Sequence, residues 1–539
     1  MQGAGGDSVN IAAPVLQHVR RVPDMIALVV PQLSADGTTY SETTMSYGEL
    51  GERIAQCQSG LAGQGFKRGS RIILMAPLSV DLYALLLGIF AAGMSAVFID
   101  TGMSRKKVMQ AISDSQADAI VSVGALLKYR VLLPALWGLK KFSVDSSGWG
   151  LSPMANLFAE DAAQRDCVAT DPDEQALITF TSGSTGRPKG ADRTQGLLTA
   201  QHLALAEHFP NQDHEVDMPC FPVVTLHNLC SGIPTILPAV DFRAPATVDP
   251  IFVFEQIERW GVTRMSGAPA YIDKIVAHLE ATDGRETRIR GLAVGGAPVP
   301  IGLCERILAV FPNCDAQVVY GSTEAEPIAS VGMDEVVAEA ERAEQLGLLV
   351  GTCAHVAEVA LVSLPADLSR LDERGIEPYR VATGTPGELI VSGPHVNRGY
   401  LNNPAADQAN KLYGNDGVIW HRTGDVATFD EQNRLWLQGR VKDLVQYGEL
   451  QLQPLPVEAA LDKVEGVERA ALIQTQKGAR CVLALEASRS LDDLQPELDR
   501  ELGRFQLQGI EISLVSPIPM DYRHNSKIDR VGLRARLES

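Results

Sequence analysis

The sequence predicts an α/β fold: a large N-terminal domain in which helices cover mostly parallel sheets, a β-rich subdomain, and a small α+β domain at the C-terminus. Three observations predict it. Strand-like and helix-like apolar runs alternate over residues 44–123, short strand-like runs separated by turns follow Glu388, and a compact segment of mixed pattern follows Arg440. Strand–helix alternation is typical of a parallel sheet covered by helices. With 539 residues, the chain is long enough for two to four folding units.

The spacing of apolar residues predicts the individual elements of the N-terminal part. We expect a helix over 47–61, a strand over Arg71–Met75, a helix over 106–115 and a strand over 119–123. The alternation resumes after Thr179 and continues past Val319. This order again indicates a mostly parallel sheet.

One apolar segment is long enough to resemble a membrane span. Residues 82–99 contain no charged residue and reach the length of a transmembrane helix. Gly88 and Gly93 interrupt the segment, however, and Asp81 and Asp100 bound it. We therefore expect a buried helix to about residue 92, a turn at Gly93 and then a buried strand, without stable membrane insertion.

The second half of the chain predicts the other two units. Residues 387–393, 418–430 and 434–440 have the pattern of short strands, which places the β-rich subdomain at about 345–440. Residues 458–464 have the pattern of a helix, and two strand patterns, further helices and a polar tail follow. We expect a large domain over 1–440, a small domain over 441–539 and a linker at about 439–443.

Composition excludes several classes of function. The formal net charge of −19 would repel a polyanion, so we expect no nucleic-acid partner, and an ATP site would need positive groups of its own. None of the eight cysteines forms a C-x-x-C pair or a Cys/His cluster with zinc spacing, which favours free thiols in a reducing compartment. The first ten residues lack a charged and an apolar region of a secretory signal. Together these features predict a cytoplasmic protein.

Residues 180–190, FTSGSTGRPKG, have the composition of a phosphate-binding loop. Glycines let a backbone curve around a ligand, hydroxyls donate hydrogen bonds, and a lysine neutralises charge. The spacing does not fit the G-x-x-x-x-G-K-[ST] loop of P-loop NTPases, and the strand-like run ALITF precedes it. A flexible surface loop is the alternative that this stretch alone leaves open.

The whole string T-S-G-S-T-G-x-P-K-G closely resembles the phosphate loop of the adenylate-forming superfamily, which includes acyl-CoA synthetases, peptide-synthetase adenylation domains and luciferases. Further motifs follow in the order of that family: VGGAP at 294–298, YGSTE at 320–324, RTGD at 422–425, a Gly-Arg pair at 439–440, and the tail PMDYRHNSKIDR. The resemblance covers roughly residues 44–530.

The resemblance implies ATP and Mg²⁺ as cofactors and assigns residues to them. Tyr320 would stack on adenine, Thr323 would reach the α-phosphate, Glu324 would be the metal ligand, and Asp425 would accept from both ribose hydroxyls. The implied catalytic residues are Lys527, Lys189, Thr323 and Glu324. The implied nucleotide-binding residues are Thr181, Ser182, Gly183, Ser184, Thr185, Gly186, Gly296, Ala297, Pro298, Tyr320, Gly321, Ser322, Asp425 and Arg440.

Further implied positions surround the acid substrate and the domain hinge. Thr225 stands where the family often has an aromatic or histidine gate, and His227 lies two residues later. A packed or solvated side chain is the alternative for that histidine. Ser266 and Gly267 complete the implied substrate pocket, and Lys442 occupies the hinge position. Two departures from the family pattern are Ser526, where a glycine usually precedes the catalytic lysine, and Glu-Leu-Gln after Gly448, in place of the usual turn residues of the thioester-forming face.

The family reaction joins a small-molecule carboxylic acid to ATP, giving an acyl-adenylate and pyrophosphate. Lys527 would bridge the carboxylate and the α-phosphate, which requires the small domain to be mobile and to close on the large one. The three strongest similarities to the β-lactone synthetases of bacterial olefin biosynthesis are residues 221–250, the SGAPA–AVGGAPVP spacing and the tail D-x-R-H-N-S-K-I. This favours a long-chain or 3-hydroxy fatty acid that closes to a β-lactone.

Other fates of the adenylate stay open. Transfer to CoA or a carrier thiol would make the protein an acyl-CoA synthetase or acyl-AMP ligase, although the sequence does not favour CoA. An amino acid is disfavoured because the stretch FPVVTL offers no Asp for its ammonium group. A catalytically silent nucleotide-binding homologue is a further alternative, opposed by the joint presence of Lys189, Glu324, Asp425 and Lys527. Enzyme partners from a pathway also stay open.

Overall fold

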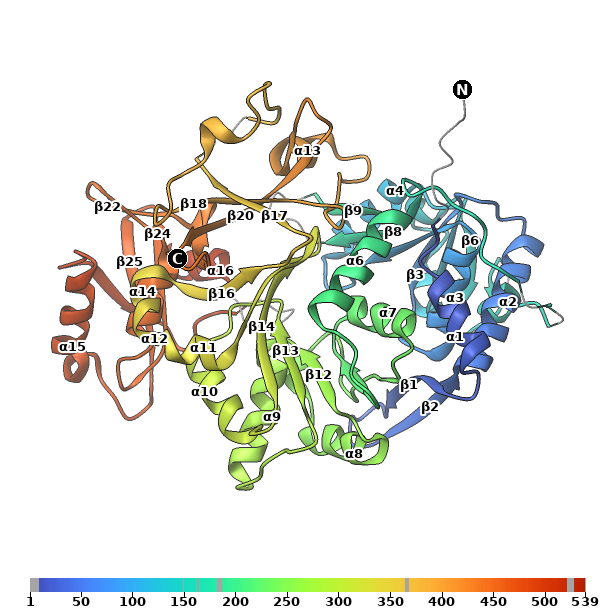
Figure 1. Cartoon of the computed structure of the whole chain (residues 1–539), viewed down its shortest axis with the longest axis horizontal. Helices are drawn as coiled ribbons and strands as arrows, with labels where there is room; N and C mark the ends of the chain where they lie inside the picture. The colour runs from blue at the N-terminus through green and yellow to red at the C-terminus, as the bar shows by residue number, and fades with distance from the viewer. Residues whose placement is uncertain are drawn as a thin grey trace.

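Figure 1 shows a computed structural model of the whole chain, which describes residues 9–148, 150–160, 162–163, 165–181, 187–363, 368–520 and 528–538. Two sheets with their helices make up most of the molecule, and a smaller unit lies at the C-terminal end. The α/β fold class that the sequence predicts is confirmed.

The first sheet has seven strands and is parallel except at one edge. Its order is β7-β6-β5-β3-β4-β8-β9, and only β8 and β9 run antiparallel. Its strands are β3 (Arg71–Met75), β4 (Ser95–Ile99), β5 (Ala119–Ser122), β6 (Lys140–Ser143), β7 (Ser152–Pro153), β8 (Gln175–Thr181) and β9 (Lys189–Thr194).

Helices cover both faces of this sheet. Successive residues of each strand point to opposite faces, so each strand packs against helices on both sides. Ile72 and Leu74 of β3 pack in one apolar cluster with helices α2 (Tyr47–Gly63) and α3 (Val80–Ala91). Ile73 between them packs in another cluster with α4 (Arg105–Ser115). The smaller α5 (Gly124–Leu127) follows β5, and α6 (Gln195–His208) follows β9.

The long apolar segment at 82–99 is a helix and a strand, as predicted. Helix α3 ends at Ala91, Gly93 adopts a left-handed φ of 66°, and β4 begins at Ser95. No helix within the described residues is long and apolar enough to cross a membrane. The eight cysteines are free thiols.

The second sheet has fourteen strands and changes character at β14. From β14 to β1 neighbouring strands are parallel, whereas from β14 to β17 they are antiparallel. The parallel half contains β1 (Ile26–Leu33), β10 (Asp217–Pro219), β11 (Thr235–Ile236), β12 (Arg264–Gly267), β13 (Gly291–Gly295) and β14 (Asp315–Ser322), with β2 (Tyr40–Ser46) antiparallel at the edge. The helices that follow its strands are α7 (Pro222–Ser231), α8 (Pro250–Trp260), α9 (Pro269–Ala281) and α10 (Ile301–Val310). Helix α1 (Ala13–Arg21) packs against α2 and α7.

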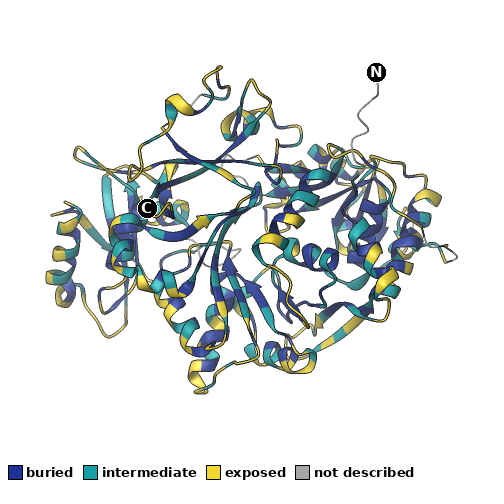
Figure 2. Ribbon diagram, viewed as in Figure 1, coloured by how far each residue is buried: buried dark blue, intermediate teal, exposed yellow. Residues whose placement is uncertain are grey.

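The antiparallel half forms the β-rich part that the sequence predicts. It lies above the parallel half in Figure 1, and Figure 2 shows that its strands are largely buried while its loops are exposed. Its elements are β15 (Ala325–Gly332), α11 (Met333–Ala338), α12 (Ala340–Leu346), β16 (Leu348–Cys353), β17 (Glu358–Val362), β18 (Gly387–Ser392), α13 (Pro404–Asn410), β19 (Lys411–Tyr413), β20 (Ile419–Phe429) and β21 (Leu435–Arg440).

The C-terminal unit has its own sheets, one of three strands and one of two, and its own apolar cores. Glu344 of α12 accepts ion pairs from Lys463, at 3.0 Å, and from Arg504, so the unit contacts the rest of the chain through charged groups. The domain boundary at residues 440–441 stays a prediction. The elements of the unit are β22 (Val445–Tyr447), β23 (Leu450–Leu452), α14 (Pro454–Leu461), β24 (Val467–Thr475), β25 (Gly478–Leu485), α15 (Leu491–Arg504), β26 (Glu511–Leu514) and α16 (Arg530–Glu538).

Two details of this unit and one of the preceding strand differ from the sequence prediction. The helix expected at 458–464 begins earlier, because Pro454 and Pro456 fit a first helical turn, where a proline loses no hydrogen bond. Strand β26 was not predicted, because its four residues become a strand only by pairing with β25. Gly439 and Arg440, expected in the linker, end β21 and pair with Val426 and Asp425.

A close helix contact gives a test of the packing. A Cβ on Gly60 of α2 would lie 2.2 Å from the backbone oxygen of Leu157, whereas Gly63 of the same helix has no atom within 4 Å. We expect Gly60→Ala to lower the free energy of unfolding by roughly 1–3 kcal/mol, because the backbone of residue 157 must move. Gly63→Ala should leave it unchanged or raise it by up to about 1 kcal/mol. Chemical denaturation of both variants checks this, and equal effects would contradict the packing.

Candidate functional site

The carboxyl ends of four parallel strands place several predicted residues along one edge of the large sheet. The registers Pro219↔Ser266, Gly267↔Val294 and Gly295↔Val319 align the ends of β10, β12, β13 and β14. Ligands of parallel α/β sheets bind at such an edge. The predicted residues that end these strands or directly follow them are Ser266, Gly267, Gly296, Ala297, Pro298, Tyr320, Gly321 and Ser322.

Thr323 and Glu324 form the two-residue turn between β14 and β15. The backbone oxygen of Thr323 accepts a hydrogen bond from Arg193 of β9 at 2.8 Å. The backbone oxygen of Glu324 accepts one from the amide of Asn397 at 2.7 Å. The first sheet and the segment after β18 therefore both hold this turn in place.

Lys189 lies at the start of β9, where it pairs with Thr181 of β8. The loop between them carries Ser182, Gly183, Ser184, Thr185 and Gly186, which lie outside the described residues. The Lys189 ammonium donates to Asn410 Oδ1 at 3.3 Å and lies 5.4 Å from the centre of the Tyr400 ring. Burial lowers its pKa, Glu324 opposes this, and Lys442 adds to it. The predicted hinge residue Lys442 is therefore within electrostatic reach of the site.

Tyr320 and Arg440 contact opposite oxygens of Asp425. The Tyr320 hydroxyl donates to Asp425 Oδ2 at 2.7 Å, and Arg440 Nε lies 2.8 Å from Oδ1. Asp425 of β20 pairs directly with Arg440 of β21, which explains why residues fifteen positions apart meet. Burial, and then the charge of Asp425, raise the pKa of Tyr320, so its hydroxyl stays protonated. The predicted adenine and ribose residues therefore form one group.

A buried polar cluster behind Lys189 and Glu324 was missed in the sequence. The Tyr400 hydroxyl donates to Glu324 Oε1 at 2.8 Å, and Lys411, fully buried, donates to the backbone oxygen of Asn397. The only sequence signal is the aromatic residue in RGYL at 398–401. Lys411 gives none, because a lone lysine is usually solvated and its burial depends on the pairing of β19 with β20.

Burial sets the charges of this cluster. It lowers the pKa of Lys411 to about 7 and that of His421 to about 3. Burial also disfavours the charged form of Glu324, yet the nearby basic groups and the hydrogen bond from Tyr400 hold its pKa below the ordinary value. Glu324 is therefore ionised at neutral pH.

Thr225 and His227 both lie on α7 and are buried. His227 Nδ1 is 3.0 Å from Nδ1 of His202, and its Nε2 is 3.4 Å from Ser231 Oγ. Burial, with smaller contributions from His202 and Arg264, lowers the His227 pKa to about 3. This side chain is therefore neutral at physiological pH and a poor proton acceptor.

Ser266 differs from these residues because its hydroxyl is buried without a hydrogen-bond partner among the described residues. A buried polar atom without a partner is uncommon and calls for an explanation, such as a ligand that supplies the missing bond.

The donor set fits magnesium better than a transition metal. Within the described residues, no group of three or more His, Cys, Asp or Glu side chains could hold a metal ion. Magnesium usually binds through one or two carboxylates together with substrate phosphates. The ionised Glu324, within electrostatic reach of the predicted phosphate-loop residue Lys189, fits that pattern.

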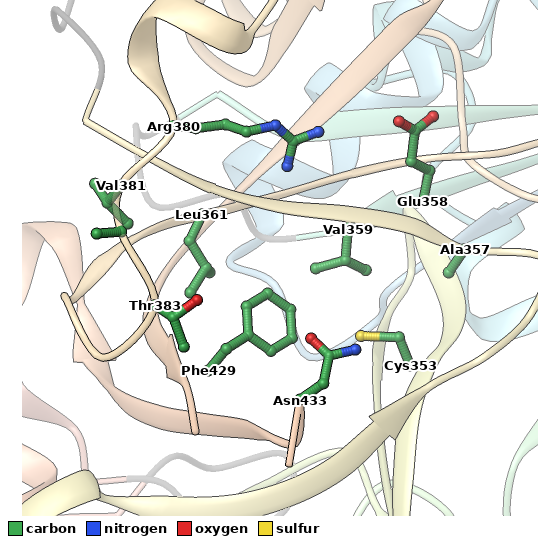
Figure 3. A pocket seen from close by; sticks show the side chains of 11 residues that line it. Cys353, Ala357, Glu358, Val359, Leu361, Arg380, Val381, Thr383, Phe429 and Asn433 are labelled. Atoms are coloured by element: carbon green, nitrogen blue, oxygen red, sulfur yellow. The ribbon is translucent and has the colours of Figure 1, made fainter. Parts of the chain in front are cut away.

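The predicted catalytic lysine is not placed by the structure. Lys527 is outside the described residues, although Met520 and Ile528 on either side of it form an antiparallel bridge. A cavity of about 510 Å³ lies apart from the predicted site, on the β-rich part. Figure 3 shows the side chains that line it, with Phe429 between those of Arg380 and Cys353. None of the predicted site residues lines this cavity.

A model described as AMP-binding enzyme matches residues 15–401. The chain belongs to the AMP-binding enzyme family. It is 32% identical to an olefin beta-lactone synthetase from Stenotrophomonas maltophilia (strain K279a), over 97% of both chains. It is 30% identical to a feruloyl-CoA synthase from an Amycolatopsis species, over 81% of this chain and 82% of that one.

The fold of this AMP-binding enzyme also matches solved structures. The o-succinylbenzoate coenzyme A synthetase (MenE) of Bacillus subtilis, in complex with ATP and magnesium ion, superposes with a TM-score of 0.74 at 20% identity, covering 98% of this chain and 99% of that chain. The resemblance inferred from the motifs is confirmed, and the protein is an adenylate-forming acid ligase.

The Asp425 group predicts the effect of a substitution on nucleotide binding. Asp425→Ala removes the partner of Tyr320 and Arg440, and with it the predicted acceptor for the ribose hydroxyls. We therefore expect ATP affinity to fall by about 10- to 100-fold, the usual value of a hydrogen bond to a charged group. Calorimetric titration with ATP measures this. Asp372→Ala, which breaks an exposed ion pair with Arg374 on the same part of the chain, is the control and should bind like the wild type.

The His227 pKa predicts a pH dependence of stability. Its folded value of about 3 lies below the ordinary 6.5, so the unfolded chain binds more protons between these values, and stability rises with pH across this window. Acidification from pH 7 to pH 5 should therefore destabilise the protein, with up to about 1.4 kcal/mol per pH unit from this residue. The fall in melting temperature should be smaller in His227→Asn. The exposed His214 provides the control, and an equal fall in His227→Asn and His214→Asn would contradict the assignment.

Proposed function

We propose that this protein adenylates a long-chain 3-hydroxy fatty acid and closes the product to a β-lactone, releasing AMP and pyrophosphate. The convergence of Lys189, Glu324 and the Tyr320–Asp425–Arg440 group on one region is the observation that carries the adenylation step. Similarity over 97% of the chain to an olefin beta-lactone synthetase supports the lactone product.

Different residues of the chain would bind different parts of the nucleotide. Asp425 would accept from the ribose hydroxyls, and the Tyr320 ring would face the adenine. Lys189 and the loop at 181–186 would hold the outer phosphates, and Thr323 would donate to the α-phosphate. Glu324 would ligate magnesium, which neutralises phosphate charge when bound.

Formation of the adenylate requires two anions to meet. A carboxylate oxygen attacks the α-phosphorus while the bond to pyrophosphate breaks. We propose that Lys527, carried by the C-terminal unit, lies between the carboxylate and the phosphate at this step and reduces their repulsion. The unit would rotate about Lys442, after the contacts of Glu344 with Lys463 and Arg504 break.

Ring closure would use the hydroxyl of the same acid. Its oxygen attacks the activated carbonyl carbon, the bond to AMP breaks, and one proton is released. The unpartnered hydroxyl of Ser266 supports a substrate that carries a polar group into this region. The neutral His202–His227 pair and the buried Thr225 offer no charged group for an amino acid's ammonium.

A thioester product is the second candidate. The 30% identity to a feruloyl-CoA synthase favours transfer of the acyl group to CoA.

Product analysis decides between the two. The purified protein is incubated with ATP, Mg²⁺ and either a long-chain 3-hydroxy acid or the plain fatty acid of equal length, with and without CoA. We expect AMP, pyrophosphate and a product lighter than the hydroxy acid by one water, without CoA, because the hydroxyl is the internal nucleophile. A strict need for CoA would establish the thioester reaction instead.

A substitution in the tail checks the role of Lys527. Lys527→Ala should bind ATP normally but release almost no pyrophosphate. Lys477→Ala, which removes an exposed lysine in the β24–β25 turn of the same unit, should react like the wild type. Pyrophosphate release at the wild-type rate by Lys527→Ala would refute the assignment.

A further inference from the structure

Tyr400 is the point where several parts of the candidate site meet. Its hydroxyl donates to Glu324 Oε1 at 2.8 Å. The ammonium groups of Lys189 and Lys411 lie 5.4 Å and 5.6 Å from the centre of its ring. The phenol therefore touches the predicted metal ligand at one end, while its ring is close to the predicted phosphate-loop lysine and to a second, buried lysine.

The backbone around Tyr400 is fixed on two sides. Its amide donates to Asp407 Oδ1 at 2.7 Å, and the residue forms a bridge with Ala191 of β9. The amide of the next residue, Leu401, donates to the backbone oxygen of Gly190 at 2.8 Å. Tyr400 is therefore attached to the strand that begins with Lys189.

The partners of Glu324 are also tied to this segment. Asn397 donates from its backbone to the Glu324 oxygen and from its side chain to the backbone of Asp192 at 2.8 Å. Lys411 in turn donates to the backbone oxygen of Asn397. The backbone and the carboxylate of Glu324 thus both accept hydrogen bonds from the same short segment, residues 397–401.

We propose that Tyr400 is a positioning residue that orients the Glu324 carboxylate toward the divalent cation and couples this metal site to Lys189. The inference rests on the proposed role of Glu324 as the magnesium ligand. Burial, and then the charge of Glu324, raise the pKa of Tyr400, so the hydroxyl stays protonated and can only donate to the carboxylate. Groups that hydrogen-bond to a metal ligand typically change metal affinity by about 10- to 100-fold when they are removed.

Two substitutions separate the hydroxyl from the ring. Tyr400→Phe removes the bond to Glu324 and keeps the ring beside both lysines. We expect the Mg²⁺ concentration that half-saturates ATP binding to rise by about 10-fold or more, while ATP affinity without Mg²⁺ stays at the wild-type value. Tyr400→Leu also removes the ring that Lys189 contacts, so ATP affinity without Mg²⁺ should fall as well.

The measurement is calorimetric titration of ATP at a series of Mg²⁺ concentrations, with no acid present. Tyr47→Phe is the matched control, because Tyr47 is also buried and donates its hydroxyl to a backbone oxygen, that of Leu229 at 3.1 Å, on α7. Loss of the Tyr47 hydroxyl should lower the stability of the protein without changing the Mg²⁺ dependence of ATP binding.

The outcomes are distinct from those of the proposed reaction. An unchanged Mg²⁺ half-saturation in Tyr400→Phe overturns the inference, as does a wild-type ATP affinity that does not respond to Mg²⁺. A wild type that binds ATP with Mg²⁺ but converts no acid would refute the proposed function, and the Tyr400 result would still stand on its own.

Discussion

The two-residue turn between β14 and β15 is the constraint on which the rest of the candidate site depends. Arg193 holds one of its carbonyl oxygens and Asn397 holds the other, so the turn is tied to two segments that are far apart in the sequence. This anchoring brings the Glu324 carboxylate to Tyr400 and within electrostatic reach of Lys189. The turn therefore helps to fix the predicted metal ligand, on the second sheet, relative to the predicted phosphate-loop lysine, on the first.

The position of β14 in the large sheet explains why the site forms there. It is the last parallel strand and also the first antiparallel one. Its parallel neighbours align their carboxyl ends and present Ser266, Gly267 and Gly296 along one edge. Its antiparallel side leads to the β-rich part, where Asp425 and Arg440 pair across β20 and β21 and Asp425 accepts from Tyr320. Strand β14 thus connects the parallel half of the sheet to the antiparallel half, and the candidate site lies where they meet.

Burial gives the site an electrostatic character that the whole chain lacks. The molecule carries a formal charge of −19, yet Lys189 and Lys411 both lie within electrostatic reach of the Glu324 carboxylate. Because their surroundings are poorly solvated, these charges act more strongly on one another than exposed groups would. The local cations can therefore attract a nucleotide that the overall field would repel.

The sequence by itself determined the fold class, the alternating elements of the N-terminal part and the motifs at Lys189, Tyr320, Glu324 and Asp425, because periodicity and short motifs depend on neighbouring residues. It could not supply Tyr400, Lys411 or the Arg193 contact, since each depends on pairing between strands that lie far apart in the chain. Strand β26 and the early start of α14 were missed for a related reason: a four-residue strand needs a partner, and prolines suit a first helical turn. Only the tertiary structure decided which motif residues contact one another and which buried side chains stay ionised. Distance and solvent exclusion are properties of the packed chain.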